Sequence, residues 1–458
     1  MRTSKNAWAG RRCHAKCIVV LVVLALAPAL KAAERPPNII MILADDLGWG
    51  DVSFNGRTEW STPNLDRMAK EGTCFKRWYT AAVVCAPSRA ALMTGRYSIH
   101  NGVTGNGSLD LPADEVTIAG ALKAKGYVTA LFGKWHHGGP RPGSKTYTHP
   151  MDQGFDEFFG FTEARHAWQK FPKELFDGRE TKPSKGYADA LFAEHSIDFI
   201  KRQKDKPFFL YLAFIAPHGL QEAPEEDISA NLPNVPDRLC ATYAAQITRM
   251  DKEIGRVMGA VKEAGIDENT LVVFSSDHGA TFEVMQKGTT ARLDSNKPFR
   301  GQKRQLWEGG VRVPGIVRWP GKVPAGAVSQ EVMHMCDVMP TFLAAAGASV
   351  DPKWKVDGMN VLDVWMGKAK APDRMIFWEW DEGGDKQLAA MHGNLKLVIT
   401  GGNKPELFDV VADPAERITL HAVHPQELKK LDEALTQWYG TMSEAAKQKK
   451  RGAKGEGE

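Results

Sequence analysis

Four nearly uninterrupted apolar runs constrain the fold of this chain more than any other feature. They read NIIMILA, YVTALFG, PFFLYLAFIA and TLVVFSS, and they cover residues 38–44, 127–133, 207–216 and 270–276. Runs of this length without polar alternation are typical of strands buried on both faces, as in a parallel sheet covered by helices. Helix-like stretches lie between or after these runs, at 116–125, 187–203 and 241–264. The alternation predicts an α/β fold with a doubly wound, mostly parallel sheet flanked by helices.

The sequence pattern changes after residue 341. A short Ala-rich helix is expected to end at Gly347, and the segments MIFWEW, NLKLVIT and PELFDV then follow, separated by Gly, Asn and Asp. This pattern predicts a smaller C-terminal antiparallel sheet, closed by a helix over 425–439. We expect a main domain over 34–365, an α+β subdomain over 366–445 and a disordered tail over 446–458, for which a basic contact surface is the alternative.

The first 33 residues resemble a secretory signal peptide. A basic stretch precedes an apolar run over 17–30, and small residues follow before Glu34. The run is shorter than the roughly 20 apolar residues of a transmembrane helix, so an uncleaved anchor is the minor alternative. We expect an exported, periplasmic or secreted protein with no stable membrane insertion after the leader is cleaved. Four cysteines then remain, and the sequence leaves any disulfide pairing open.

The charge of the chain gives no support to nucleic-acid binding. The formal net charge is +4, but six of the 59 Lys and Arg residues lie in the first 33 residues, which contain no acid. The remaining 53 basic residues face 55 acidic ones. A nucleic-acid-binding protein is expected to carry its basic excess on the folded part, so we expect no nucleic-acid partner.

Each of the four apolar runs ends in polar residues. They are Asp45 and Asp46 after the first run, Lys134 and His136 after the second, His218 after the third, and Asp277 and His278 after the fourth. In open α/β sheets ligands bind outside the carboxyl ends of the strands, so these distant positions are expected to converge. Taken singly, each residue is more often a turn residue, a solvated charge or a core histidine.

The segment VVCAPSRAALMTGR, residues 83–96, places a cysteine at a predicted helix start. Pro87 suits the first turn of a helix and Gly95 can end it, which leaves Cys85 beside the amino end. Exposed N–H groups and the helix dipole favour developing negative charge there. The alternative is an ordinary buried cysteine.

These residues resemble the type I, formylglycine-dependent sulfatases of the alkaline phosphatase superfamily. Cys85 to Arg89 fits the C-x-P-S-R signature of that family, and the resemblance extends in order over residues 38–420 through ILADDLGWGD, GKWH, APHG, SSDHG, RGQK, EGGVRVP, ELFDV and DPAE. The region PHGLQEAPEED is similar to that of N-acetylgalactosamine sulfatases, and the chain also resembles arylsulfatases. The resemblance implies an alkaline phosphatase-like fold.

The resemblance also implies that Cys85 is oxidised to formylglycine by a formylglycine-generating or anaerobic sulfatase-maturating enzyme. The hydrated aldehyde has two hydroxyl groups, so one can attack sulfur and the other can later expel sulfate as the aldehyde re-forms. A divalent cation is implied as the bound metal, with Ca²⁺ favoured and Mg²⁺ as the alternative. Its implied ligands are Asp45, Asp46, Asp277, His278 and the modified Cys85.

The remaining implied roles concern charge and protons. Lys134 and Lys303 match the lysines that hold sulfate, and Arg89 matches the arginine that steadies the hydrated aldehyde. His218 matches the histidine near the leaving oxygen, and His136 matches the one that contacts the hydrate. Neighbouring residues that are expected to meet the organic part of the substrate, or only solvent, are His137, Gln221, Glu222 and Arg304.

We therefore expect a sulfatase that hydrolyses a small sulfate ester or a sulfated carbohydrate, either a polysaccharide or a glycosaminoglycan. The alternatives are a phosphate or phosphonate monoester hydrolase of the same superfamily, and a non-catalytic binder of sulfated glycans. Specificity is expected to come from the loops over 161–171 and 221–235, with exo action in a pocket. Its expected lining is Arg165, His166, Trp168 and Arg304.

Overall fold

The computed structural model describes residues 35–106, 110–138, 148–163, 168–282, 287–382, 385–444 and 446–447 of the chain. The expected leader and residues 448–458 of the expected tail lie outside the described residues. Within the described part, no helix has the length and apolarity to cross a bilayer. The described residues from Pro36 onward form one compact unit. The four cysteines of this part are buried free thiols.

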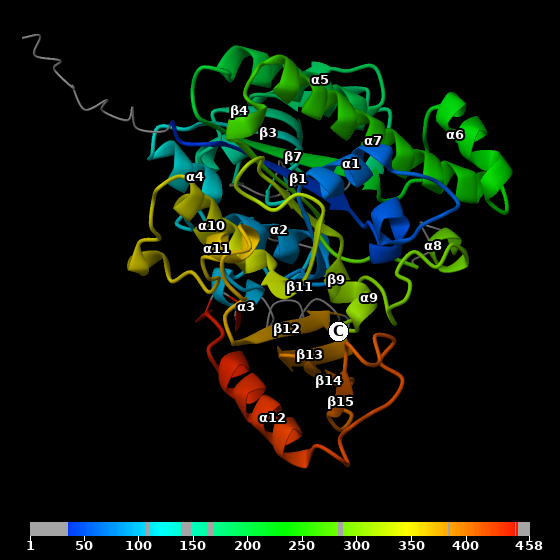
Figure 1. The fold of residues 1–458 in the computed structure, drawn as a ribbon, viewed down its shortest axis with the longest axis vertical. Coiled ribbons are helices and arrows are strands. Elements are labelled where there is room, and N and C mark those ends of the chain that lie inside the picture. Colours follow the sequence, from blue (N-terminus) through cyan, green and yellow to red (C-terminus); the bar gives the residue numbers. More distant parts are fainter. Residues whose placement is uncertain are drawn as a thin grey trace, which may run out of the picture. The chain divides into compact units, whose positions relative to one another are not determined.

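The largest element is an 11-stranded sheet (Figure 1). Ten of its strands follow the order β11-β2-β10-β8-β1-β7-β3-β4-β5-β6, and the eleventh, β9, pairs with β2. The bounds are β1 (Asn38–Asp45), β2 (Thr73–Tyr79), β3 (Val128–Lys134), β4 (Glu157–Phe161), β5 (Glu174–Asp177), β6 (Glu180–Pro183), β7 (Phe208–Pro217), β8 (Thr270–Ser276), β9 (Arg312–Val313), β10 (Gly315–Arg318) and β11 (Ala327–His334). The four apolar runs form β1, β3, β7 and β8, which lie side by side and run parallel. The predicted mostly parallel sheet is confirmed.

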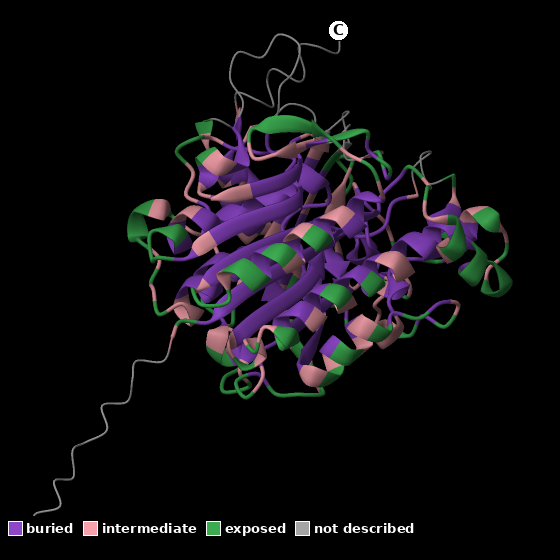
Figure 2. Cartoon of the chain, turned by 90° about the horizontal axis from the view of Figure 1, so that it is seen from above, coloured by how far each residue is buried: buried purple, intermediate pink, exposed green. Residues whose placement is uncertain are grey.

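Helices cover both faces of this sheet, because the strand side chains alternate between two cores. In β1, Ile39, Met41 and Leu43 pack into one hydrophobic cluster, whereas Ile40 and Ile42 pack into the other. The first cluster includes α2 (Cys85–Thr94), α4 (Ile118–Lys123) and α10 (Val338–Ala345), and the second includes α1 (Pro63–Glu71), α5 (Ala188–Gln203) and α7 (Arg238–Glu263). Figure 2 shows the strands buried between helices whose outer faces are exposed.

The remaining helical segments are short. They are α3 (Ser98–Asn101), α6 (Glu225–Asn231), α8 (Thr289–Arg292), α9 (Glu308–Val311) and α11 (Leu362–Trp365), with single 3-10 turns at Trp49–Asp51, Ser53–Asn55, Pro150–Gln153, Leu232–Asn234, Asp267–Asn269, Met335–Asp337 and Pro352–Trp354. The predicted helix over 241–264 begins earlier, at Arg238, because the Asp237 side chain accepts a hydrogen bond from the Cys240 amide and caps it.

The structure also contains strands that the apolar runs did not indicate. β2 carries Lys76 and Arg77 among its apolar residues, and β10 is only four residues long. β10 runs antiparallel to both β2 and β8, so this side of the sheet is mixed rather than purely parallel. These strands lack a continuous apolar run because they include charged residues whose side chains bond to polar groups outside the sheet. For example, the Lys76 ammonium donates a hydrogen bond to the Asn55 side chain.

The C-terminal part is a four-stranded antiparallel sheet, as predicted. It comprises β12 (Met375–Glu382), β13 (Asp385–His392), β14 (Leu395–Thr400) and β15 (Glu406–Asp409), and α12 (Pro425–Gly440) follows. One face packs against Leu306 and Trp307 of the main sheet's loops, while Leu397 on the other face shares a cluster with Leu431 and Leu435 of α12. The sheet therefore lies between α12 and the segment that follows residue 300 (Figure 1).

Candidate active site

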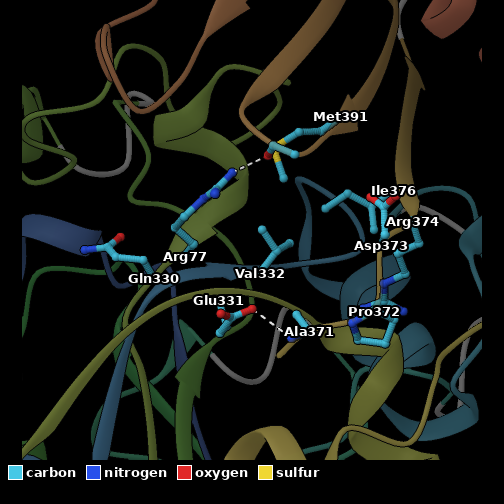
Figure 3. A pocket seen from close by; sticks show the side chains of 11 residues that line it. Arg77, Gln330, Glu331, Val332, Ala371, Pro372, Asp373, Arg374, Ile376 and Met391 are labelled. Carbon is cyan, nitrogen blue, oxygen red and sulfur yellow. Dashed lines mark hydrogen bonds between the residues drawn. The ribbon is translucent and has the colours of Figure 1, made fainter. Parts of the chain in front are cut away.

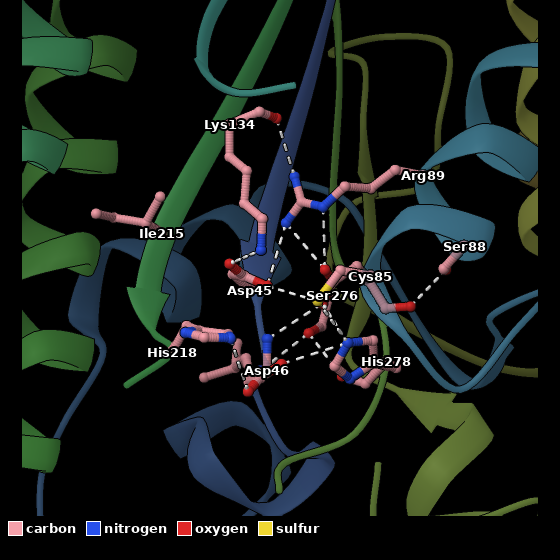
Figure 4. A network of polar contacts seen from close by, with 12 residues as sticks. Asp45, Asp46, Cys85, Ser88, Arg89, Lys134, Ile215, His218, Ser276 and His278 are labelled. Carbon is pink, nitrogen blue, oxygen red and sulfur yellow. Dashed lines mark hydrogen bonds and ion pairs between the residues drawn. The ribbon is translucent and has the colours of Figure 1, made fainter. Parts of the chain in front are cut away.

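Carboxylates from two neighbouring strands meet at the carboxyl edge of the sheet. Asp45 is the last residue of β1, and Asp277 directly follows β8. The Asp277 amide donates to the Ala44 carbonyl over 3.2 Å, and the Asp46 amide donates to the Asp277 side chain over 3.1 Å. All three aspartates are buried. Figure 4 shows Asp45 and Asp46 beside Cys85, as expected from the parallel pairing of these strands.

Cys85 is the first residue of α2 and faces the same point. Val84 before it is extended, and Gly95 ends the helix in the left-handed conformation with φ of 66°. The Cys85 Sγ lies 3.3 Å from His278 Nε2, 3.5 Å from Asp45 Oδ1 and 3.8 Å from Lys303 Nζ. Burial raises the pKa of the Cys85 thiol to about 12, although Lys134 and Lys303 act in the opposite direction. The encoded side chain is therefore a neutral thiol at pH 7, not a thiolate nucleophile.

The donor set at this point fits a divalent cation. One possible ligand atom from each of Asp45, Cys85, Asp277 and His278 lies within 4.8 Å of the others. The same holds for a second group, which comprises Asp45, Asp46, Cys85 and His218. Burial, and after it the neighbouring Asp45 charge, raise the pKa of Asp277, although His278 and Arg89 oppose this. A hard cation among these oxygens would relieve that repulsion.

The hydrogen bonds of two histidines fix which ring nitrogen faces the centre. The Nδ1 atoms of His278 and His218 lie 3.0 Å from the Gly279 carbonyl and 2.6 Å from the Gly219 carbonyl. A carbonyl only accepts, so each Nδ1 carries the proton in the neutral ring and each Nε2 presents a lone pair to the centre. This is the orientation of a metal-bound histidine, and it places His278 Nε2 at 3.3 Å from Asp46.

Three cations lie against the three carboxylates. The Lys134 ammonium is 2.6 Å from Asp45, and the Lys303 ammonium is 2.9 Å from Asp46. The buried Arg89 guanidinium is 2.9 Å from Asp277 and 3.4 Å from Asp45. Burial opposes ionisation of Asp45, but the Lys134, Arg89 and Lys303 charges hold its pKa well below the ordinary value. The centre thus holds charged groups of both signs out of water.

The two histidines with expected proton roles differ in their surroundings. His218 Nε2 lies 3.8 Å from Asp46, and burial lowers the pKa of His218 to about 4 against the pull of Asp46 and Asp45. His136 is buried with φ of 62°, and neither ring nitrogen has a hydrogen-bond partner among the described residues. Burial and the neighbouring Lys134 charge keep the pKa of His136 well below its usual range.

Two serines that support the site were not predicted from the sequence. The Ser276 hydroxyl accepts from the Leu47 amide over 3.0 Å and donates to the His278 carbonyl over 2.9 Å, so it braces the chain on either side of the carboxylates. The Ser88 hydroxyl donates to the Asp277 carbonyl over 2.5 Å. Both serines belong to recognised motifs, SSDHG and CAPSR, but a serine in such a motif gives no sign of which backbone group it will contact.

The neighbouring residues divide into packing and surface groups. His137 is buried and packs edge-on against Trp135, with 4.8 Å between the ring centroids. It is therefore a core residue. Trp168 lies nearly parallel to the His218 ring, at 6.4 Å and 15°. Gln221 is partly exposed and Glu222 is exposed. Arg165 and His166 lie outside the described residues.

A separate cavity of about 290 Å³ lies at the junction of the two sheets. Figure 3 shows Arg77 and Val332 on one side of it and Met391 and Ile376 on the other. Arg77 donates to the Gly393 carbonyl and to the Asn394 side chain, so its charge ties β2 to the turn between β13 and β14. None of the residues lining this cavity belongs to the carboxylate centre.

Comparisons with known proteins agree on one family. The profile described as Sulfatase matches residues 37–348, and that described as N-sulphoglucosamine sulphohydrolase, C-terminal, matches residues 300–443. The chain is 32% identical to N-acetylgalactosamine-6-sulfatase of Canis lupus familiaris, over 89% of this chain and 81% of that protein. It is 32% identical to arylsulfatase G of Rattus norvegicus, over 85% and 84%.

A solved structure gives the same result. Ps i-CgsB in complex with k-i-k-neocarrahexaose aligns with a TM-score of 0.83 and 31% identity, covering 90% of this chain and 94% of that one.

Proposed function

The chain belongs to the sulfatase family and is a sulfuric ester hydrolase, and from that premise we propose that it removes sulfate from a sulfated carbohydrate by way of a formylglycine at position 85. The observation that carries the proposal is the convergence on Cys85 of three buried carboxylates and the ammonium groups of Lys134 and Lys303. Such a centre can hold a divalent cation and a sulfate group together, with opposite charges on either side.

The neutral thiol supports conversion of Cys85. A buried thiol with a pKa near 12 is a poor nucleophile, whereas a hydrated aldehyde at the same place offers two hydroxyl groups. In the proposed reaction one hydroxyl attacks sulfur and the bond from sulfur to the substrate oxygen breaks. The second hydroxyl then gives its proton to His136, the C–O bond between residue 85 and the sulfate oxygen breaks so that sulfate leaves, and the aldehyde re-forms before water hydrates it again.

The chain's own residues supply charge and protons to these steps. Lys134 and Lys303 would bind the sulfate oxygens on which charge develops, and Arg89 holds Asp277 and Asp45 in place. His218 presents Nε2 to the centre while Nδ1 is held by Gly219, so a proton at Nε2 can pass to the leaving oxygen. The negative charge of a bound sulfate ester would raise the pKa of His218 above its value near 4.

The cation is proposed to be Ca²⁺, held by Asp45, Asp46, Asp277, His278 and the modified Cys85. When bound, it would lower the pKa of the attacking hydroxyl and polarise a sulfate oxygen. Carboxylate oxygens favour Ca²⁺ or Mg²⁺, and a site that uses several carboxylates with little room for water favours the larger ion.

A carbohydrate substrate is supported by the relatives and by one aromatic ring. N-acetylgalactosamine-6-sulfatase and the complex with neocarrahexaose both concern sugars. Trp168 lies nearly parallel to His218 beside the centre, and an indole face is a suitable surface for a sugar ring. We propose exo action on terminal or short sugars.

Two measurements test this proposal. A peptide map of protein produced with a maturation enzyme should show residue 85 as an aldehyde. Sulfate release should then be compared across sulfated monosaccharides, glycosaminoglycan oligosaccharides, algal polysaccharide fragments, steroid sulfates and matched aryl sulfate and phosphate. Turnover of steroid sulfates without any carbohydrate would overturn the substrate proposal, and a preference for aryl phosphate would overturn the assignment of sulfate as the group transferred.

We also propose that residues 1–33 direct export of the protein and are then removed. The basic and apolar pattern of that segment supports the proposal. Amino-terminal sequencing of the mature protein from the periplasm or medium should begin near residue 34, and recovery of the intact leader in a membrane fraction would contradict it.

A further inference from the structure

The segment that carries Lys303 is held by backbone contacts to both halves of the active centre. The Lys303 amide donates to the Ala280 carbonyl over 3.1 Å, and the Arg304 amide donates to the Val83 carbonyl over 3.0 Å. Ala280 lies two residues after His278, and Val83 lies two residues before Cys85. These contacts join the Lys303 segment to the ends of β8 and α2.

A third contact comes from the C-terminal sheet. Gln387 of β13 is 2% exposed. Its Oε1 accepts from the Leu306 amide over 3.0 Å, and its Nε2 donates to the Arg304 carbonyl over 3.0 Å. One side-chain amide from a different sheet thus closes two hydrogen bonds to the backbone that directly follows Lys303.

The backbone at this point needs such support. Arg304 has φ of 68°, the left-handed region that a non-glycine residue adopts only when its surroundings impose it. Gln387 bonds on either side of Gln305 and so fixes the chain just past this turn. The Arg304 guanidinium also lies over the Trp380 ring of β12, at 5.6 Å, so the same sheet holds the side chain.

We propose that Gln387 is a positioning residue for the reaction, and that the C-terminal sheet sets the place of the Lys303 ammonium through it. The inference rests on the proposed function, in which Lys303 binds the sulfate group. The geometry at stake is that of Lys303 Nζ, 2.9 Å from Asp46 and 3.8 Å from the Cys85 Sγ. A small displacement of this ammonium would weaken its contact with sulfate and leave the nucleophile in place.

Glutamine is suited to this task because the loop presents one donor and one acceptor. A glutamate could still accept from Leu306 but would place a carboxylate oxygen against the Arg304 carbonyl. A leucine of similar size would leave both backbone groups buried without their partner. The two variants therefore remove one and both bonds respectively.

The test is a double-mutant cycle between Gln387 and Lys303 in fully matured, metal-loaded enzyme. The variants are Gln387→Leu, Gln387→Glu, Lys303→Met and the double variants, with kcat and KM measured on an aryl sulfate and the Kd of inorganic sulfate measured by calorimetry. Gln387→Leu should lower kcat/KM by about 10- to 100-fold, with a weaker Kd for sulfate, and Gln387→Glu should lower it less. In the Lys303→Met background, the Gln387 substitutions should lower kcat/KM by less than about 2-fold, because the ammonium that Gln387 positions is absent.

Leu397→Ala is the matched control. Leu397 lies in the neighbouring strand of the same sheet and packs toward α12. The Leu397→Ala substitution should therefore lower the melting temperature without changing kcat/KM or the Kd for sulfate. Additive losses in the cycle, or no loss with Gln387→Leu and Gln387→Glu, overturn the inference while the proposed function stands. Unchanged activity in Lys303→Met overturns the proposed role of that lysine and the inference with it. If Gln387→Leu does not fold, the Gln387→Glu arm decides.

Discussion

At the scale of single residues, the centre depends on groups whose ordinary chemistry has been shifted by burial. The Cys85 thiol, the Asp277 carboxyl and the His218 ring are all displaced toward their neutral forms by the loss of water. Lys134 and Lys303 keep their carboxylate partners within hydrogen-bonding distance. The residues with proposed catalytic roles are thus either displaced toward their neutral form or paired with an opposite charge.

Replacing Cys85 tests the proposed nucleophile directly. Cys85→Ala should abolish turnover and leave the fold and cation binding largely intact, because it removes the nucleophile and no carboxylate. Cys85→Ser should complete at most one sulfation event, since a serine has no second hydroxyl to expel sulfate. Single-turnover and steady-state assays distinguish these outcomes, and sustained turnover by either variant would exclude the formylglycine mechanism.

At the scale of elements, glycines let three strands approach one another beneath the centre. Gly133 of β3 has φ of 122°, and a Cβ at this position would lie 1.9 Å from the Ala213 carbonyl oxygen of β7. Gly160 of β4 has φ of 148°, and a Cβ there would lie 2.0 Å from the Gly133 carbonyl oxygen. Because Lys134 directly follows Gly133, the close approach of these strands sets where this ammonium enters the site.

Gly133→Ala should therefore destabilise the protein severely, by about 3 kcal/mol or more, because the clash is with backbone that cannot move aside. Gly126→Ala is the control, since Gly126 has φ of 85° but open space around it, and it should cost only about 1 kcal/mol of backbone strain. Urea unfolding of both variants measures the difference. Equal losses would show that φ alone, and not the packing of β3 against β7, dictates the glycine.

A buried charge cluster joins the C-terminal sheet to α9. The Lys396 ammonium of β14 lies 3.0 Å from both Glu308 and Glu416, and Glu308 also pairs with Arg312 and accepts from Tyr79. Burial, followed by the neighbouring Glu308 charge, raises the pKa of Glu416 to about 7 in spite of Lys396. Lys396 is thus shared between Glu308 and Glu416, and Glu416 is the carboxyl group that keeps a proton below about pH 7.

This cluster predicts a pH dependence with a definite sign. Between the ordinary pKa of 4.5 and about 7, the folded protein keeps a proton on Glu416 that the unfolded chain has released. The free energy of unfolding should fall as pH rises through this window, by up to about 1.4 kcal/mol per pH unit. Glu416→Gln should reduce the drop in melting temperature between pH 5 and 8, and the exposed Glu427→Gln should leave it unchanged. An unaltered pH profile in Glu416→Gln would contradict this account.

At the scale of the whole molecule, the proposed cation would link stability to activity. Three aspartates at the carboxyl ends of β1 and β8 are brought together by the fold. A cation that binds only the folded protein stabilises it by about 2.7 kcal/mol at a concentration of 100 times Kd. Chelation should lower both the melting temperature and the activity, and Ca²⁺ should restore both more fully than Mg²⁺. Full activity and stability after chelation would show that Asp45, Asp46 and Asp277 are not cation ligands.

The sequence by itself determined the central sheet and most of the centre. Continuous apolar runs have no stable place except between two layers, so β1, β3, β7 and β8 could be read directly. Parallel strands share one carboxyl edge, so the polar residues that end them had to meet. The segment from Cys85 to Gly95 carries its own helix start and stop, which is why the placement of Cys85 at the amino end of α2 was predictable.

Only the tertiary structure decided the mixed edge of the sheet and the supports of the site. β2 and β10 are four to seven residues long and include charges that are satisfied by partners far along the chain, so their sequence has no apolar period to reveal them. Gln387 lies 84 positions beyond Lys303, and a glutamine in a strand carries no sign of the backbone it will bind. Its contact exists because the C-terminal sheet packs on the loop after residue 300, and such long-range packing depends on the whole fold and not on local sequence.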